Sequence, residues 1–365
     1  MRVAVDAREL CGRPTGVGRY LTGLLDAWST GDAMRRHQWT LIAPRPIERA
    51  SRWAAAAEVM PGGGGTMWEQ WTLPHAVSSA RPDVFFAPGY TAPLTVAAPL
   101  VLTIHDLSFF AHPEWFSFRE GTRRRLLTAW SARRARTVIT DSEFSKAEIA
   151  THIGITNARV IPLGIEGSRD RSEEGSGGRS HDRASIVLFV GSLFQRRRVD
   201  RLIQAFDQVA DRVSGAQLEI VGENRTQPPI DFEAIRRGCR HADRITIRSY
   251  VDDAVLSSLY GRASVFAFLS EYEGFGLTPL EALADGVPPL VLDTAVARET
   301  CGAAARYVSP SASNADIAVA LEDLLTNESA RQDVLRHRGD VLRRYDWNLA
   351  AAATLSVLEE AAGGR

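Results

Sequence analysis

Lysine is almost absent from this sequence. Lys146 is the only one, so nearly all of the 43 basic residues are arginines. An arginine at a given position therefore cannot be interpreted as a choice over lysine. Cysteine is scarce too: Cys11, Cys239 and Cys301 are odd in number and widely spaced. That spacing predicts neither a disulfide framework nor a zinc site.

The chain also lacks an excess of charge and any long apolar run. Its net charge is −1, whereas bulk nucleic-acid binding usually leaves a basic excess. No run of about 18 apolar residues offers a membrane span. The N-terminal segment "MRVAVDARELCG" has no long apolar stretch, so no signal peptide is predicted. We therefore expect a cytoplasmic protein that does not bind nucleic acid.

Strand-like and helix-like segments alternate along the 365 residues. This alternation is typical of an α/β protein with parallel sheets, and the length suits two domains. A helix is expected to follow the glycine-rich segment 12–20, and residues 54–68 are predicted to form a mobile surface loop. The strands expected in the first half are residues 2–6, 39–43, 83–88, 100–106 and 137–142, followed by "RVIPLG" (159–164).

The pattern restarts after a polar segment at 166–184, whose Gly, Ser and charged residues predict a linker or flexible loop. Residues 185–191 are predicted to form a new apolar strand, and an amphipathic helix follows from Val199. Further strands are expected at 217–222, 245–251 and 264–270. We predict domains at 1–165 and 185–345, with a C-terminal helix at 346–365 packing back on the first. Two Rossmann-like domains facing across a cleft would bind ligands at the carboxyl ends of their strands.

The segment "SEYEGFGLTPLEALADGVP" (270–288) places two glutamates around a tight turn. Thr278 suits a helix N-cap, with Pro279 in the first turn and Glu281 completing a capping box. Capping does not explain Glu273 or the glycines before the helix. Glycines there let backbone N–H groups approach an anion, which the helix dipole favours.

Three other segments have the same strand–loop–helix setting. "TGVGRY" (15–20) is either a simple tight turn or a loop that presses its backbone against a ligand. "GSLFQRRRVDRL" (191–202) has arginines at the start of a helix, the unfavourable end for cations, so it is either a solvated turn or an anion site. In "TIHDL" (103–107), His105 and Asp106 end a strand, either as structural and capping residues or as part of the site.

Residues 118–139 are predicted to form a basic, partly amphipathic helix. Such a helix is either a solvated surface or a peripheral contact with an anionic membrane. Its arginines are Arg119, Arg123, Arg124, Arg125, Arg133, Arg134 and Arg136.

In their order along the chain, these segments resemble the retaining glycosyltransferases of family 4, which have the GT-B fold. Residues 270–288 are similar to the family's E-x₇-E signature. Further matches cover almost the whole chain: "DARELCGRPTGVGRY", "VLTIHDLSFFAHPEWF", "ITDSEFSKAEI", "VIPLGIE", "FVGSLFQRRRVDRLIQAF" and "YVDDAVLSSLYGRASVFAFLSEYEGFG". The family usually has Arg-Lys where this chain has Arg196, Arg197 and Arg198, and usually Asn where it has Leu163.

The resemblance implies a role for each candidate residue. Glu273 would bind donor-sugar hydroxyls and place negative charge beside the reacting carbon, while His105 would lie against the transferred sugar. Glu281 would bind the ribose hydroxyls. Arg196 and Arg197 would neutralise the diphosphate, so neither a metal nor another cofactor is expected. The other donor-binding residues implied are Gly16, Gly18, Gly274, Phe275, Gly276 and Leu277.

The function implied is transfer of a hexose from a nucleoside-diphosphate sugar, such as GDP-mannose, to a hydroxyl of a glycan or lipid-linked acceptor. "MWEQWTLPHAV" (67–77) and the histidine–aspartate segment are most similar to mannosyl- or related hexosyltransferases of polysaccharide assembly. Many members glycosylate lipid-linked acceptors, so a peripheral location at the inner membrane face is expected. Two alternatives remain open: a GT-B-type sugar-nucleotide epimerase, with added carboxylates on the first domain, and a non-catalytic nucleotide-sugar-binding subunit.

Overall fold

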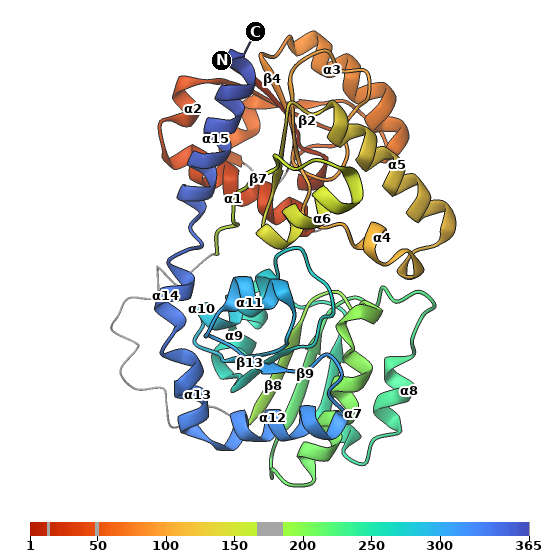
Figure 1. The fold of residues 1–365 in the computed structure, drawn as a ribbon, viewed down its shortest axis with the longest axis vertical. Helices are drawn as coiled ribbons and strands as arrows, with labels where there is room; N and C mark the ends of the chain where they lie inside the picture. Colours follow the sequence, from red (N-terminus) through yellow and green to blue (C-terminus); the bar gives the residue numbers. More distant parts are fainter. Residues whose placement is uncertain (13–14, 48–50, 166–184, 365) are drawn as a thin grey trace. The chain divides into compact units, whose positions relative to one another are not determined.

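The computed structural model describes residues 1–12, 15–47, 51–165 and 185–364. It separates into two compact units, Met1–Gly164 with Tyr345–Arg365, and Ile165–Arg344. Each unit is built on one sheet covered by helices (Figure 1). The linker predicted at 166–184 lies outside the described residues.

The sheet of the first unit has seven strands in the order β3-β2-β1-β4-β5-β6-β7, and all neighbours pair in parallel. Its apolar strands are buried on both faces, as expected where helices cover a parallel sheet. The strands are β1 Arg2–Asp6, β2 Gln38–Ala43, β3 Ala57–Val59, β4 Val84–Ala87, β5 Leu100–Thr103, β6 Thr137–Thr140 and β7 Arg159–Val160. The α-helices are α1 Gly16–Thr30, α2 Ala33–Arg36, α3 Leu73–Ala80, α4 Ser108–Ala111, α5 Phe118–Arg134, α6 Glu143–Ile153 and α15 Trp347–Gly363.

The second unit repeats this architecture with six parallel strands in the order β10-β9-β8-β11-β12-β13. The strands are β8 Ile186–Val190, β9 Gln217–Val221, β10 Ile245–Arg248, β11 Val265–Phe268, β12 Pro289–Leu292 and β13 Arg306–Val308. The α-helices are α7 Val199–Ala210, α8 Phe232–Arg237, α9 Asp253–Arg262, α10 Leu277–Ala284, α11 Ala295–Cys301, α12 Asn314–Thr326, α13 Glu328–Leu335 and α14 Arg338–Leu342.

The strand order creates one topological switch point in each sheet. The chain leaves β1 toward β2 on one side, while β4 pairs on the other side; β8 stands in the same relation to β9 and β11. Loops at the carboxyl ends of such neighbouring strands diverge and leave room for a ligand. The glycine-rich and the arginine-rich segments each leave a strand at a switch point.

The C-terminal helix α15 packs on α1, the first helix of the same unit. The Trp28 indole N–H donates to the Ala351 carbonyl oxygen at 2.9 Å. Trp347 fills the space beside two glycines: an added Cβ would lie 2.4 Å from its ring at Gly23 and 2.3 Å at Gly164. Glycine is thus required at both positions for α15 to dock.

The structure corrects the prediction of a mobile surface loop at 54–68. Residues 57–59 form the edge strand β3, which pairs with β2. Trp68 is buried, and its indole N–H donates to the Met60 carbonyl oxygen at 2.8 Å. The segment therefore belongs to the packed unit. Among the helices of the described ranges, none has the length and apolar character needed to cross a membrane.

Candidate functional site

Two loops lie side by side at the switch point of the second unit. The first follows β8 and contains the short 3-10 helix η6 (Gln195–Arg197), and the second follows β11 and leads into α10. The Glu271 backbone N–H donates to the Arg196 carbonyl oxygen at 2.9 Å. The Arg198 guanidinium also pairs with the Glu271 carboxylate. The neighbouring arginines and glutamates are therefore held together across the two loops.

Glu273 and Arg197 form the centre of this arrangement. Arg197 Nε donates to Glu273 Oε1 at 2.8 Å, and Ser270 Oγ donates to the same oxygen at 2.9 Å. Oε2 makes no hydrogen bond with a described residue. Arg197 Nη1 donates to the Ser192 carbonyl oxygen at 3.0 Å, and Nη2 makes no such bond with the described chain. An acceptor and a donor thus remain uncommitted on adjacent, oppositely charged groups.

The ionised state of Glu273 is set by its surroundings. Its side chain is 16% exposed, and burial raises the pKa of the carboxyl. Arg197 and Arg196 lower that pKa, as do the hydrogen bonds from Arg197 and Ser270, and together they hold it below the ordinary 4.5. Glu273 is therefore a carboxylate throughout the neutral range and a weak proton acceptor.

Packing fixes the Arg197 side chain in this position. Its guanidinium carbon lies 4.9 Å from the Phe268 ring centroid and 5.5 Å from that of Phe194, a cation–π geometry. Gly191 has φ +141°, and an added Cβ would lie 2.6 Å from Arg197 Nη1. A side chain at Gly191 would therefore displace the arginine.

The start of α10 corrects the predicted cap. The helix begins at Leu277, and its N-cap is Gly276 with φ 87°, in the left-handed region that favours glycine. Thr278 therefore lies inside the first turn, and Glu281 is two residues beyond the N3 position that a capping box requires. Capping does not account for Glu281.

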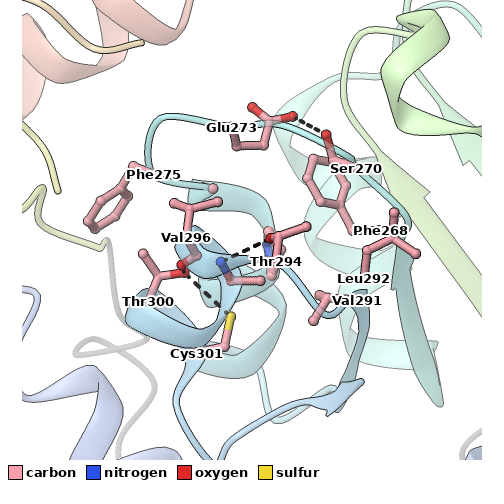
Figure 2. A pocket seen from close by; sticks show the side chains of 13 residues that line it. Phe268, Ser270, Glu273, Phe275, Val291, Leu292, Thr294, Val296, Thr300 and Cys301 are labelled. Carbon is pink, nitrogen blue, oxygen red and sulfur yellow. Dashed lines mark hydrogen bonds between the residues drawn. The ribbon is translucent and has the colours of Figure 1, made fainter. Parts of the chain in front are cut away.

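A small pocket lies between the β11–α10 loop and α11 (Figure 2). Glu273 and Ser270 form its polar edge, and Phe275 and Val296 also line it. Phe275, Gly276 and Glu273, all predicted donor-binding or catalytic residues, line this one pocket.

The described part of the glycine loop caps the first helix, α1. Thr15 is the N-cap of α1, and its Oγ1 accepts a hydrogen bond from the Gly18 N–H at 2.9 Å. Gly18 is buried, and an added Cβ would lie 2.6 Å from the Glu9 carbonyl oxygen. Gly16 is exposed with no atom near its Cβ position. Of the two predicted glycines, Gly16 is the one with room for a ligand.

His105 is held by both of its ring nitrogens. Nε2 lies 2.8 Å from the Pro88 carbonyl oxygen, and Nδ1 lies 2.7 Å from Asp141 Oδ2. A carbonyl only accepts, so Nε2 carries a proton, and the bond to Asp141 holds a second proton between Nδ1 and a carboxylate whose own pKa is raised by burial. Burial lowers the pKa of His105, but Asp141, the Pro88 carbonyl and Asp106 raise it to a net value above 6.5. An imidazolium that joins the ends of β4, β5 and β6 fits this geometry, and neither nitrogen reaches a substrate while these bonds hold.

A buried charged cluster at the end of β1 was not expected from the sequence. Arg8 Nε donates to Asp6 Oδ2 at 2.9 Å, and Arg8 Nη1 donates to Glu69 Oε2 at 3.0 Å. Asp6 and Glu69 are each 2% exposed. Burial raises the pKa of Asp6, with Glu69 adding to the rise and Arg8 opposing it. The sequence did indicate one member of this cluster, because Asp6 ends a buried strand, as His105 does.

Two family models match the chain in succession. Residues 14–169 match "Glycosyltransferase Family 4", and residues 170–337 match "Glycosyl transferases group 1".

Curated relatives and a solved structure agree with these models. GDP-mannose:cellobiosyl-diphosphopolyprenol alpha-mannosyltransferase of Komagataeibacter xylinus is 30% identical over 68% of this chain. The alignment covers 64% of that protein, less than two thirds of its length. O-antigen chain mannosyltransferase B of Escherichia coli is 24% identical over 70% of this chain and 69% of its own. Among solved structures, Anabaena Alr3699/HepE in complex with UDP and glucose has a TM-score of 0.75 at 17% identity, covering 99% of this chain and 100% of that one.

The two parallel sheets, their switch points and the paired family models lead to one conclusion: the chain belongs to the group 1, family 4 glycosyltransferases and has the GT-B fold.

Proposed function

We propose that the protein is a retaining, metal-independent glycosyltransferase that moves a hexose from a nucleoside-diphosphate sugar to an acceptor hydroxyl. The observation that carries this proposal is the Arg197–Glu273 pair, with Glu273 Oε2 and Arg197 Nη2 uncommitted beside each other. One can accept from a sugar hydroxyl, and the other can donate to a phosphate oxygen.

In the proposed reaction the anomeric carbon leaves the diphosphate oxygen and bonds to the acceptor oxygen on the same face. The acceptor proton passes to the departing diphosphate. Glu273 contributes a fixed negative charge beside the positive charge that develops on the sugar, and Arg197 with Arg196 stabilises the leaving group. Inversion would need a base on the opposite face, and the low pKa of Glu273 makes it a poor base.

GDP-mannose is the donor we propose first, because two relatives are named as mannosyltransferases and one name includes GDP-mannose. UDP-glucose is the second choice, because the solved structure contains UDP and glucose. A glycan or lipid-linked hydroxyl is the proposed acceptor, since one relative's name includes a diphosphopolyprenol. An acceptor of that kind would place the protein at the inner membrane face, through a peripheral contact.

The epimerase alternative has one observation in its favour, the carboxylates Asp6 and Glu69 in the first unit. Both share the Arg8 guanidinium and are buried. Carboxylates held in this way do not present an acid and a base to a sugar. We therefore favour transfer, with Asp6 and Glu69 holding the end of β1 in place.

The test is to incubate the protein separately with GDP-, UDP-, ADP- and dTDP-sugars, with and without a polyprenyl-diphosphate glycan, and to identify the products. Transfer with retained anomeric configuration supports the proposal. An isomerised nucleotide sugar indicates an epimerase, and binding without turnover indicates a non-catalytic subunit.

A further inference from the structure

A surface of the first unit combines exposed aromatic and basic side chains outside the donor-binding loops. It is formed by α5 and by η3 (Trp68–Thr72), a π-helical turn, with the residues just before that turn. We call it the arginine–tryptophan surface. Its members, all exposed, are Met67, Trp71, Arg119, Arg123, Leu126, Trp130, Arg133 and Arg134.

On α5 these residues follow a single line. Successive members from Arg119 to Arg133 are three or four residues apart, and Arg134 lies four residues after Trp130, the spacing that puts side chains on one helical face. The opposite face carries Gly121, Thr128 and Ala132, all buried against the unit. The helix therefore presents Leu126 and Trp130 to solvent within a row of arginines.

The η3 turn lies beside this helix because both elements bind the same backbone segment. Gln70 Nε2 donates to the Ala92 carbonyl oxygen at 3.2 Å, and Ser131 Oγ donates to that oxygen at 3.2 Å. Trp71 and Trp130 are the sequence neighbours of these two side chains. Trp71 is 66% exposed and Trp130 is 50% exposed, whereas Trp68 of the same turn is buried. Two tryptophans from neighbouring elements are thus left exposed.

The positive charge of this surface is not neutralised by neighbouring carboxylates. Arg124 pairs with Glu120 within the helix. Within the described parts of the chain, no carboxylate forms an ion pair with the four arginines of the surface. The Arg123 guanidinium donates instead to the Thr66 hydroxyl, which ties α5 to the segment before η3.

We propose that the arginine–tryptophan surface docks on an anionic lipid membrane, with the arginines on lipid phosphates and Trp71 and Trp130 inserted at the headgroup level. Guanidinium groups match phosphate geometry, and tryptophan concentrates at membrane–water interfaces because its ring is apolar and its N–H is polar. Each basic residue near such a surface strengthens binding about five-fold. The inference rests on the peripheral contact proposed above and adds two aromatic anchors to it.

The test is sedimentation with vesicles of phosphatidylcholine containing about 30% phosphatidylglycerol, at low and high salt, beside pure phosphatidylcholine vesicles. We expect binding to the anionic vesicles at low salt that is at least ten-fold tighter than to neutral ones. The double variant Trp71→Ala/Trp130→Ala should bind at least ten-fold more weakly. It should also lose the quenching of tryptophan fluorescence by brominated lipid that the unchanged protein shows. Reversal of charge in Arg119→Glu/Arg123→Glu should weaken binding by a factor of twenty or more.

Matched controls come from exposed residues of the same unit. Leu349→Ala on α15 removes an apolar side chain that is 64% exposed, and Arg35→Glu/Arg36→Glu on α2 reverses two exposed charges. Both should bind as the unchanged protein does. Absence of binding at low salt, equal weakening by the controls, or tighter binding to a single-stranded RNA oligonucleotide would overturn the proposal. Nucleotide-sugar binding without vesicles is measured in parallel, so failure of the surface is distinguishable from failure of the donor site.

Discussion

Replacement of Arg197 by alanine perturbs two properties of the site at once. The guanidinium that donates to Glu273 Oε1 at 2.8 Å is lost, and with it the charge that most strongly opposes the effect of burial on the Glu273 pKa. The uncommitted Nη2 proposed to hold the donor diphosphate is lost as well. We therefore expect both a weaker affinity for nucleoside diphosphates and a change in the pH dependence of turnover.

The magnitudes follow from these contacts. A charge-assisted hydrogen bond contributes about 1.5–3 kcal/mol, so the affinity for the preferred nucleoside diphosphate should fall about 10- to 150-fold. Loss of an adjacent opposite charge raises a carboxyl pKa by about 1–3 units. In the unchanged protein Glu273 loses its charge only as pH falls below 4.5. In the variant, burial raises the pKa of Glu273 with less opposition, so Glu273 is protonated at a higher pH. Turnover should therefore begin to decline at a higher pH as the solution is made more acidic.

The assay is calorimetric titration with the nucleoside diphosphate, together with initial rates between pH 5 and 8. Arg198→Ala is the matched control, because Arg198 binds Glu271 and the Pro310 carbonyl oxygen, away from Glu273. Its affinity should stay within about three-fold of the unchanged protein. Equal effects of both variants, or an unchanged affinity and an unchanged decline of turnover at acid pH in Arg197→Ala, would show that Arg197 neither holds the diphosphate nor lowers the Glu273 pKa.

Three further outcomes are expected. The melting temperature should fall as pH rises through the pKa of His105, which is raised above 6.5, because the imidazolium then loses a proton that stabilises the folded state. The melting temperature of His105→Gln should depend less on pH, and an identical dependence would show that His105 is not the titrating group. Gly23→Ala should lower the free energy of unfolding by about 1–3 kcal/mol through its clash with Trp347, whereas Gly16→Ala, with open space at its Cβ position, should change it little; denaturant unfolding distinguishes them. Transfer should continue in excess EDTA, and a strict need for added magnesium or manganese would show that arginines alone do not neutralise the diphosphate.

Local patterns in the sequence predicted most of the sheet strands. Apolar runs such as 2–6, 185–191 and 264–270 correspond to β1, β8 and β11, because a strand buried on both faces must be continuously apolar. The expected strands did not include β3, β12 and β13. β3 and β13 are three-residue edge strands whose existence depends on pairing with β2 and β12, and β12 begins at Pro289.

At the candidate site, the sequence predicted which residues take part but not which side chains pair with each other. The positions of Glu273 and Arg197 were expected from the family resemblance, but their direct pairing joins residues 76 apart and depends on the tertiary fold. The capping interpretation of Glu281 failed because Gly276 adopts a left-handed conformation and starts the helix earlier. The cluster around Arg8 was not predicted either, because Glu69 lies 61 residues from Arg8 in the sequence and reaches it only in the folded unit.

The most direct test of the account is a comparison of Glu273→Gln with the unchanged protein, using the nucleotide sugar that the donor screen selects. Glutamine keeps the shape and an acceptor for Arg197 but removes the charge proposed to stabilise the reacting sugar. The turnover number for transfer should fall about a hundred- to thousand-fold, equivalent to about 3–4 kcal/mol, while melting temperature and nucleoside-diphosphate affinity change little. A folded Glu273→Gln protein that transfers sugar at a near-normal rate would contradict the central claim.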